Sequence, residues 1–77
     1  MSNYDLELDA SNLNCPLPIM KAKKAFATLS IGQTLKIIAT DPGSIKDFPA
    51  LCKGPEYELL SSSEENDKYV YFVKKTA

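Results

Sequence analysis

The 77-residue sequence contains no histidine and only two cysteines, and these shortages exclude the commonest kinds of active site. Without histidine there is no Cys-His or Ser-His-Asp catalysis and no mixed Cys/His zinc site. The two cysteines are too few for a disulfide framework, and they do not form a Cys-x-x-Cys pair. We therefore expect no metal and no cofactor, and any chemistry must use a thiol, a carboxylate, a lysine or a hydroxyl group.

The sequence also lacks long hydrophobic runs and an excess of positive charge. No stretch approaches the ~18 apolar residues needed to cross a bilayer, and the first residues lack the basic and apolar regions of a secretory signal. The formal net charge of -1 argues against general binding to nucleic acid. We expect a cytoplasmic protein with reduced thiols and no direct contact with nucleic acid or membrane.

The pattern of apolar residues predicts one domain with the element order β-α-β-α-β-β. The first strand alternates, with Tyr4, Leu6, Leu8 and Ala10 on one face, and the second is more continuously apolar, as in a central strand. The second helix is interrupted by a proline at position 49. We expect an α+β fold, a two-layer sandwich with two helices on one face of a four-stranded sheet. The predicted strands are 4–10, 34–40, 57–63 and 68–75, and the predicted helices are about 16–30 and 45–52.

The most informative segment begins at Cys15, which is followed by Pro16 and Pro18. Proline loses no hydrogen bond in the first turn of a helix, and the residue before a proline is disfavoured in helical conformation. We therefore predict Cys15 at the N-cap, with Pro16 at the first helical position and Pro18 at the third. Because Pro18 has no N–H, the N–H of Leu17 is the remaining capping donor. The partial positive charge of a helix N-terminus favours a thiolate, so Cys15 is the candidate nucleophile.

Two lysines lie one to two turns beyond this cysteine. Lys21 and Lys24 add positive potential for an anionic sulfur or for an acidic partner surface, although a lysine cluster is more often a solvated helix face. Cys52 differs from Cys15, because it shares an apolar helix face with Ile45 and Phe48. We predict that Cys52 is a buried structural thiol.

From about Leu8 to Lys75 the sequence resembles the TusA/SirA family of small sulfur carriers. The resemblance rests on two motifs together, Cys-Pro-x-Pro and a later Asp-Pro followed by Asp-x-Pro and a cysteine. The motifs are matched here by Cys15, Pro16 and Pro18, and by Asp41, Pro42, Asp47, Pro49 and Cys52. The resemblance implies the fold that the apolar pattern predicts, with a mixed sheet, and a single sulfur-carrier domain spanning residues 1–77.

The resemblance also implies a sulfurtransferase activity in which Cys15 accepts sulfane sulfur as a persulfide and passes it on. The implied donor is a cysteine desulfurase or a rhodanese-like protein. The implied acceptor is a protein with a reactive cysteine, of the DsrE/TusD-like kind. The relay leads to 2-thiouridine in tRNA or belongs to dissimilatory sulfur oxidation. We expect a monomer that works in transient complexes.

Two other functions remain open from the residues. One is a non-catalytic regulatory or nucleic-acid-associated module, in which Cys15 is incidental. The other is a thiol redox switch, which requires both Cys15 and Cys52. Replacing each cysteine in turn separates these hypotheses, because a carrier depends on Cys15 alone.

Overall fold

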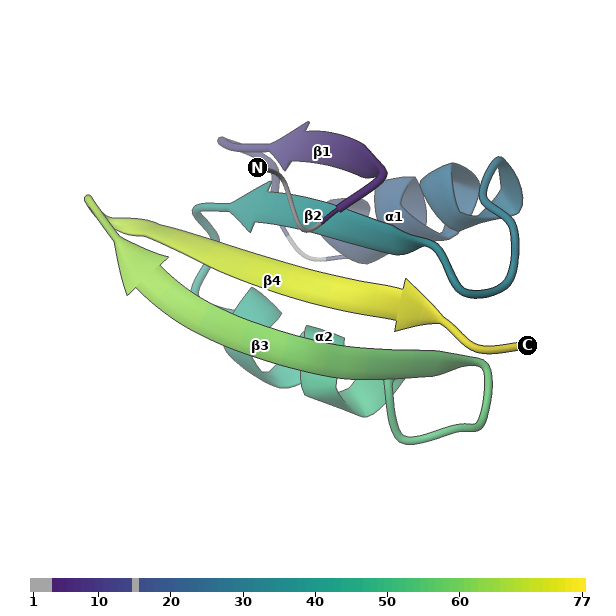
Figure 1. Cartoon of the computed structure of the whole chain (residues 1–77). Helices are drawn as coiled ribbons and strands as arrows, with labels where there is room; N and C mark the ends of the chain where they lie inside the picture. The colour runs from purple at the N-terminus through teal and green to yellow at the C-terminus, as the bar shows by residue number, and fades with distance from the viewer. Residues whose placement is uncertain (1–3, 15) are drawn as a thin grey trace.

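The computed structural model describes residues 4–14 and 16–77, and it confirms the predicted order of elements (Figure 1). The elements are β1 (Leu6–Ala10), α1 (Leu17–Ala27), β2 (Thr34–Ala39), α2 (Ser44–Leu51), β3 (Tyr57–Glu65) and β4 (Lys68–Lys75). β3 extends two residues further than predicted, because it pairs with β4 up to a tight two-residue turn at Asn66 and Asp67. Both turn residues have positive φ, as a hairpin of this length requires.

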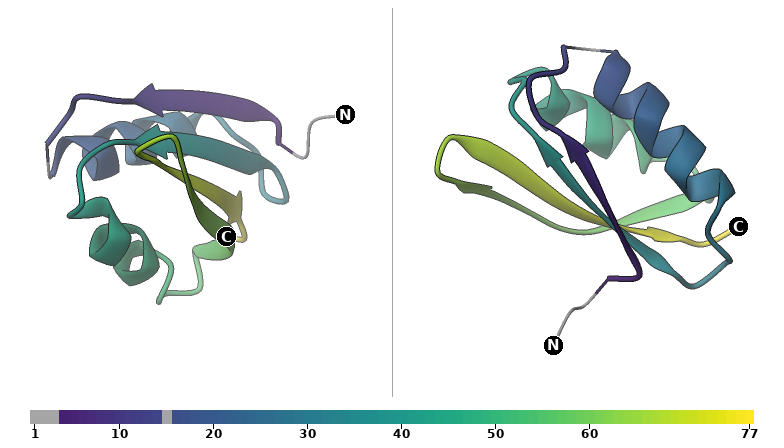
Figure 2. Two further views of the ribbon diagram at one scale, coloured as in Figure 1. Left: turned by 90° about the vertical axis from the view of Figure 1, so that its left-hand side faces the viewer. Right: turned by 90° about the horizontal axis from the view of Figure 1, so that it is seen from above.

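The four strands form one mixed sheet in the order β1-β2-β4-β3. β1 pairs with β2 in parallel, whereas β2–β4 and β4–β3 are antiparallel. Both helices lie on the same face of this sheet, and within residues 4–14 and 16–77 no second layer covers the opposite face (Figure 2). The α+β sandwich predicted from the sequence is therefore the observed fold. Among the described residues, no helix is both long and apolar enough to span a membrane.

The hydrophobic core lies between the helices and the two central strands. Alternate residues of β2 and β4, including Leu35 and Val73, are fully buried on the helical face. The ring of Phe26 on α1 packs against Tyr57, with the ring centroids 4.4 Å apart. Phe48 on α2 stacks on Tyr71 of β4 at 4.7 Å. Each helix thus contributes a buried aromatic ring that fixes it to the sheet.

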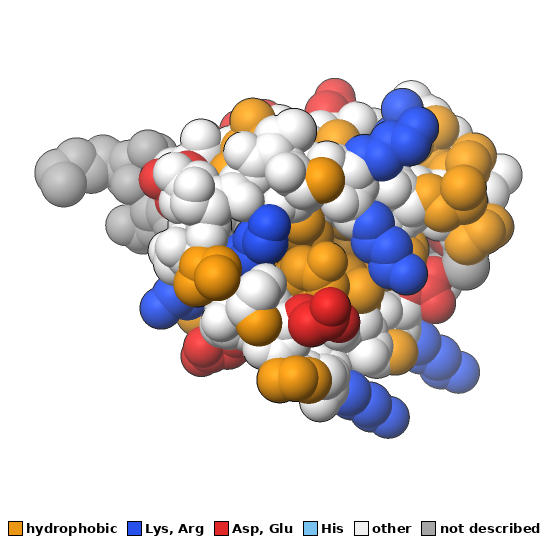
Figure 3. Space-filling view, turned by 90° about the vertical axis from the view of Figure 1, so that its right-hand side faces the viewer, with side chains coloured by type: hydrophobic (Ala, Val, Ile, Leu, Met, Phe, Trp, Pro, Cys, Tyr) orange, Lys and Arg blue, Asp and Glu red, His pale blue; other side chains and the backbone are white. Residues whose placement is uncertain are grey.

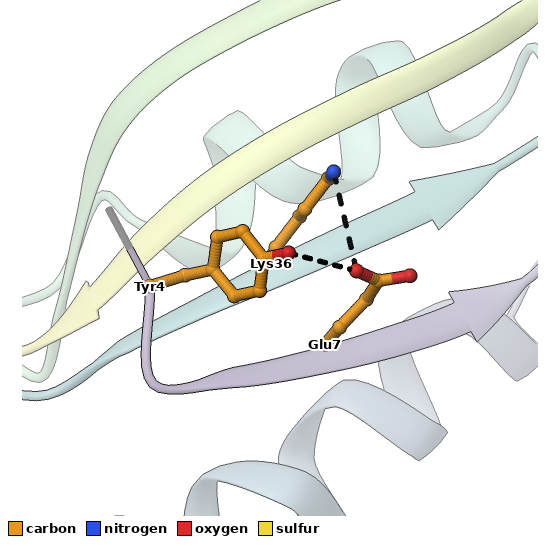
Figure 4. Close-up of polar contacts among 3 residues, drawn as sticks. All are labelled: Tyr4, Glu7 and Lys36. Atoms are coloured by element: carbon orange, nitrogen blue, oxygen red, sulfur yellow. Dashed lines mark hydrogen bonds and ion pairs between the residues drawn. The ribbon is translucent and has the colours of Figure 1, made fainter. Parts of the chain in front are cut away.

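The alternation of the first strand predicted Tyr4 on the core face, and this prediction is wrong. Pairing with β2 begins only after Tyr4, where the Asp5 N–H donates to the carbonyl of Thr34 at 2.8 Å. The Tyr4 hydroxyl donates to Oε1 of Glu7 at 3.1 Å, and Nζ of Lys36 lies 5.1 Å from the Tyr4 ring centroid (Figure 4). The Tyr4 ring also meets Phe72 edge-on at 5.9 Å. These contacts belong to the uncovered face of the sheet, because Glu7, Lys36 and Phe72 are in register there.

Both helices differ from their predicted limits by one to three residues at each end. α1 ends at Ala27 rather than near Ser30. Nζ of Lys75 donates to the carbonyl of Phe26 in its last turn and to that of Leu29 just beyond it, at 2.9 Å each. α2 keeps Pro49 inside the helix, and it buries Phe48. Ile45, predicted on the apolar face, is 51% exposed, because the sheet is covered by the opposite side of this short helix.

Candidate functional site

The candidate site lies at the carboxyl ends of the parallel strands β1 and β2. Because the two strands are parallel and end in register at Ala10 and Ala39, the loops that follow them leave the sheet at the same edge. One loop leads to Cys15 and α1, and the other leads to α2. Cys15 itself lies outside the described residues, so its predicted role as nucleophile stays a prediction.

The start of α1 differs by one residue from the prediction. The N-cap is Pro16, with φ -98° and ψ 17°, and the helix begins at Leu17, so Cys15 is not the N-cap. The reason is a tight turn before the helix, in which the Leu17 N–H donates to the carbonyl of Asn14 at 2.8 Å. The capping donor predicted for Cys15 is therefore already used. The first bond of the helix ladder runs from the Met20 N–H to the carbonyl of Pro16 at 3.0 Å.

The two prolines of the motif have different environments. Pro18 is almost completely buried and anchors the first turn against the core, whereas Pro16 is exposed. Beside them, Leu17 is 44% exposed and Met20 is 52% exposed, an apolar pair one turn apart on the solvent side of α1. The chain that carries Cys15 therefore enters a rigidly packed turn whose outer surface is apolar.

The predicted lysines lie on the same helix as this apolar pair. Lys21 and Lys24 are both exposed, which agrees with a solvated face that a partner can contact. A third lysine, Lys23, lines a groove of about 310 Å³ between the two helices. Lys23 was not among the predicted site residues, although its spacing of four residues from Ile19 places both side chains on one helix face. The groove is lined by Pro16, Ile19, Lys23, Asp47, Ala50 and Leu51.

Cys52 caps the end of α2, where it is half-buried rather than fully buried as predicted. It packs against the core, and this burial raises the pKa of its thiol above the ordinary value. A thiol held in its protonated form is a poor nucleophile. Cys52 lines a separate hollow of about 530 Å³ with Lys53, Pro55 and Tyr57. Figure 3 views the end of the molecule towards which both helices run, where apolar side chains lie between lysines and acidic side chains.

The described residues include no group of three or more cysteine, aspartate or glutamate side chains arranged to hold a metal ion. What the arrangement offers chemically is a loop with a cysteine at a helix start, next to exposed apolar and cationic side chains. The other thiol, that of Cys52, is a poor nucleophile because burial raises its pKa. Such an arrangement suits a protein whose thiol is approached by other proteins.

Comparison with known proteins places the chain in a family. The family model described as sulfurtransferase TusA matches residues 6–75. The chain is 54% identical to the sulfur carrier protein TusA of Allochromatium vinosum, over 99% of this chain and 100% of that protein. It is 43% identical to the sulfur carrier protein TusA of Pseudomonas entomophila, over 96% of this chain and 92% of that one.

A solved structure shows the same fold. The SirA-like protein of Desulfitobacterium hafniense superposes with a TM-score of 0.75 at 22% identity, covering 92% of this chain and 96% of that one. At this identity the similarity concerns the fold alone. The family match over nearly the whole chain, together with the relatives of 54% and 43% identity, establishes membership. The chain belongs to the sulfurtransferase TusA family.

Proposed function

We propose that this protein is a sulfur carrier, one domain spanning residues 1–77, which accepts a sulfane sulfur on Cys15 and transfers it to a protein thiol. The observation that carries the proposal is the 54% identity, over the full length, to a protein named as a sulfur carrier. The two thiols are also unequal. Burial raises the pKa of the Cys52 thiol, which leaves Cys15 as the better candidate for a thiolate.

The transfer consists of two thiol–disulfide-type displacements that balance without an external oxidant. In loading, the Cys15 thiolate attacks the outer sulfur of the donor's persulfide. The donor's S–S bond breaks, the donor thiolate leaves, and Cys15 carries the persulfide. In unloading, the acceptor thiolate attacks the outer sulfur and the Cys15 thiolate leaves. A lowered thiol pKa assists the second step, because a more acidic thiol is a better leaving group.

The surroundings of the motif support protein partners. Leu17 and Met20 offer exposed apolar contacts, and Lys21 and Lys24 are exposed on the same helix. We assign these lysines to attraction of an acidic partner surface, which speeds encounter at low salt. The donor is a cysteine desulfurase or a rhodanese-like protein, and the acceptor is a protein with a reactive cysteine. The carrier acts as a cytoplasmic monomer in transient complexes, without direct contact with nucleic acid.

Intact-mass spectrometry tests the proposal directly. Wild type, Cys15→Ser and Cys52→Ser are incubated with polysulfide, or with a cysteine desulfurase and cysteine. The mass of each protein is measured before and after treatment with a reductant. We expect wild type and Cys52→Ser to gain the mass of one sulfur atom, reversibly, and Cys15→Ser to gain none. Uptake that requires both cysteines would favour the redox switch. No uptake by folded wild type from any donor would favour the non-catalytic module.

A further inference from the structure

The loop that leads to Cys15 is joined to the neighbouring loop by one side chain. The N–H of Asn12 donates to Oγ1 of Thr40 at 2.8 Å. Asn12 has a φ of 65°, in the left-handed region that only a few residue types accept readily. Thr40 directly follows β2 and is half-buried. The hydrogen bond therefore connects two segments that are 28 residues apart in the sequence.

Thr40 is a firm point of attachment because it continues from the most buried strand. Ala39, immediately before it, is fully buried and is paired with Ala10 at the end of β1. Two further hydrogen bonds of the loop are local. The Ser11 N–H donates to Oδ1 of Asp9 at 3.0 Å, and the Leu13 N–H donates to the carbonyl of Ala10 at 3.3 Å. These local bonds shape the loop, whereas the bond to Thr40 places it relative to the start of α2.

We propose that Thr40 is a positioning residue for Cys15, whose hydroxyl holds the 11–14 loop against the end of β2 and so fixes where the reactive thiol enters α1. The other end of the segment is fixed by the bond between the Leu17 N–H and the carbonyl of Asn14. Both flanks of Cys15 are thus held, and a thiol kept at a helix N-terminus is favoured as the thiolate. The inference rests on the proposed function of Cys15.

The decisive variant is Thr40→Val, which keeps the shape of the side chain and removes the acceptor oxygen. A solvent-accessible hydrogen bond of this kind contributes a net ~1 kcal/mol, equivalent to a factor of about five at 1.4 kcal/mol per tenfold. We expect both persulfide transfer and the alkylation rate of Cys15 to fall, by up to about fivefold, the latter measured with iodoacetamide in a Cys52→Ser background. Thr40→Ser retains an oxygen at the same position and should restore both rates.

Thr28→Val is the matched control, because it also removes a threonine hydroxyl that makes one hydrogen bond. The Thr28 hydroxyl donates to the carbonyl of Ala25 at 2.7 Å, at the opposite end of α1. Thr28→Val should keep the wild-type rates of persulfide transfer and of Cys15 alkylation. Amide hydrogen exchange of Asn12, measured by NMR, should become faster in Thr40→Val alone. If Thr40→Val does not fold, Thr40→Ala removes the same oxygen without adding a methyl group.

The inference is overturned if Thr40→Val is alkylated at the wild-type rate, if Thr40→Ser is as slow as Thr40→Val, or if Thr28→Val slows equally. The alkylation assay does not require sulfur transfer. A wild type that takes up no sulfur would therefore refute the proposed function, whereas unchanged alkylation of Thr40→Val would refute only the positioning role.

Discussion

A buried pair of hydroxyl groups joins the start of α2 to the central strand β4. Oγ of Ser44 lies 2.8 Å from the hydroxyl of Tyr71, and the two residues are 1% and 3% exposed. Phe48 stacks on the Tyr71 ring, at an interplanar angle of 28°. The hydrogen bond and the ring stack together hold α2 on the sheet, and hence they hold the loop after β2 that carries Thr40.

Removing one member of the pair should cost more than removing both. Ser44→Ala or Tyr71→Phe leaves the other hydroxyl buried without a partner, which costs about 1–3 kcal/mol. The double variant removes both polar groups and keeps the apolar ring in place. We expect it to be more stable than either single variant, so that the coupling energy of the cycle is at least the cost of one single variant, about 1–3 kcal/mol.

Urea unfolding followed by circular dichroism measures these free energies, provided that the slope with urea is the same in all variants. Tyr4→Phe is the control, because it removes a tyrosine hydroxyl bonded to Glu7 on the exposed face of the sheet. The free energy of unfolding of Tyr4→Phe should fall by no more than about 0.5 kcal/mol. Additive effects of Ser44→Ala and Tyr71→Phe, with a coupling below about 0.3 kcal/mol, would refute the buried-pair argument.

Three further predictions concern stability. Lys75→Met should lower the free energy of unfolding by about 1–2 kcal/mol, because the Lys75 ammonium donates to the carbonyls of Phe26 and Leu29 at the end of α1; an unchanged urea midpoint would contradict this. Asp67→Gly should raise the free energy of unfolding by up to about 1 kcal/mol, since Asp67 has a φ of 64° that glycine adopts without strain, and a lower melting temperature would count against it. Burial raises the pKa of Tyr71 above its ordinary value of 10.0, partly offset by its hydrogen bond. The folded state therefore retains this proton where the unfolded state releases it, so the contribution of Tyr71 to stability is constant below about pH 10 and is lost above it. Urea titrations at rising pH should show that the free energy of unfolding falls less in Tyr71→Phe than in wild type. Equal falls in the two proteins would contradict the role of Tyr71.

The order of elements and most of the core could be predicted because they depend on local periodicity. In β4, for example, Tyr71 and Val73 are buried and alternate with Phe72, since a buried face leaves a strict two-residue pattern. The pattern misled at Tyr4, because pairing starts one residue later and nothing local marks that boundary. Ile45 was misplaced because a helix of two turns does not define its buried face well by spacing alone.

The candidate site was partly predictable for a similar reason. The prolines of the motif show that a helix starts close to Cys15, but the hydrogen bond of Asn14 with Leu17 decides which residue is the cap. Thr40 was missed because its relation to the loop spans a helix and a strand. Such a contact leaves no sign in the spacing of residues, and only the parallel register of β1 with β2 brings it about.

The strand order has a consequence for how the protein is made. β4 is the last strand in sequence, yet it lies between β2 and β3 in the sheet. On the ribosome, β1 and β2 can emerge and pair, but β3 has no strand to bind and Leu35 lacks its partner Val73 until the final strand has left the exit tunnel. Until then the nascent chain exposes the unpaired edge of β2 and the ring of Phe48, which has no Tyr71 to stack on. Folding into the finished sheet follows as one late step, governed by contacts that are distant in sequence.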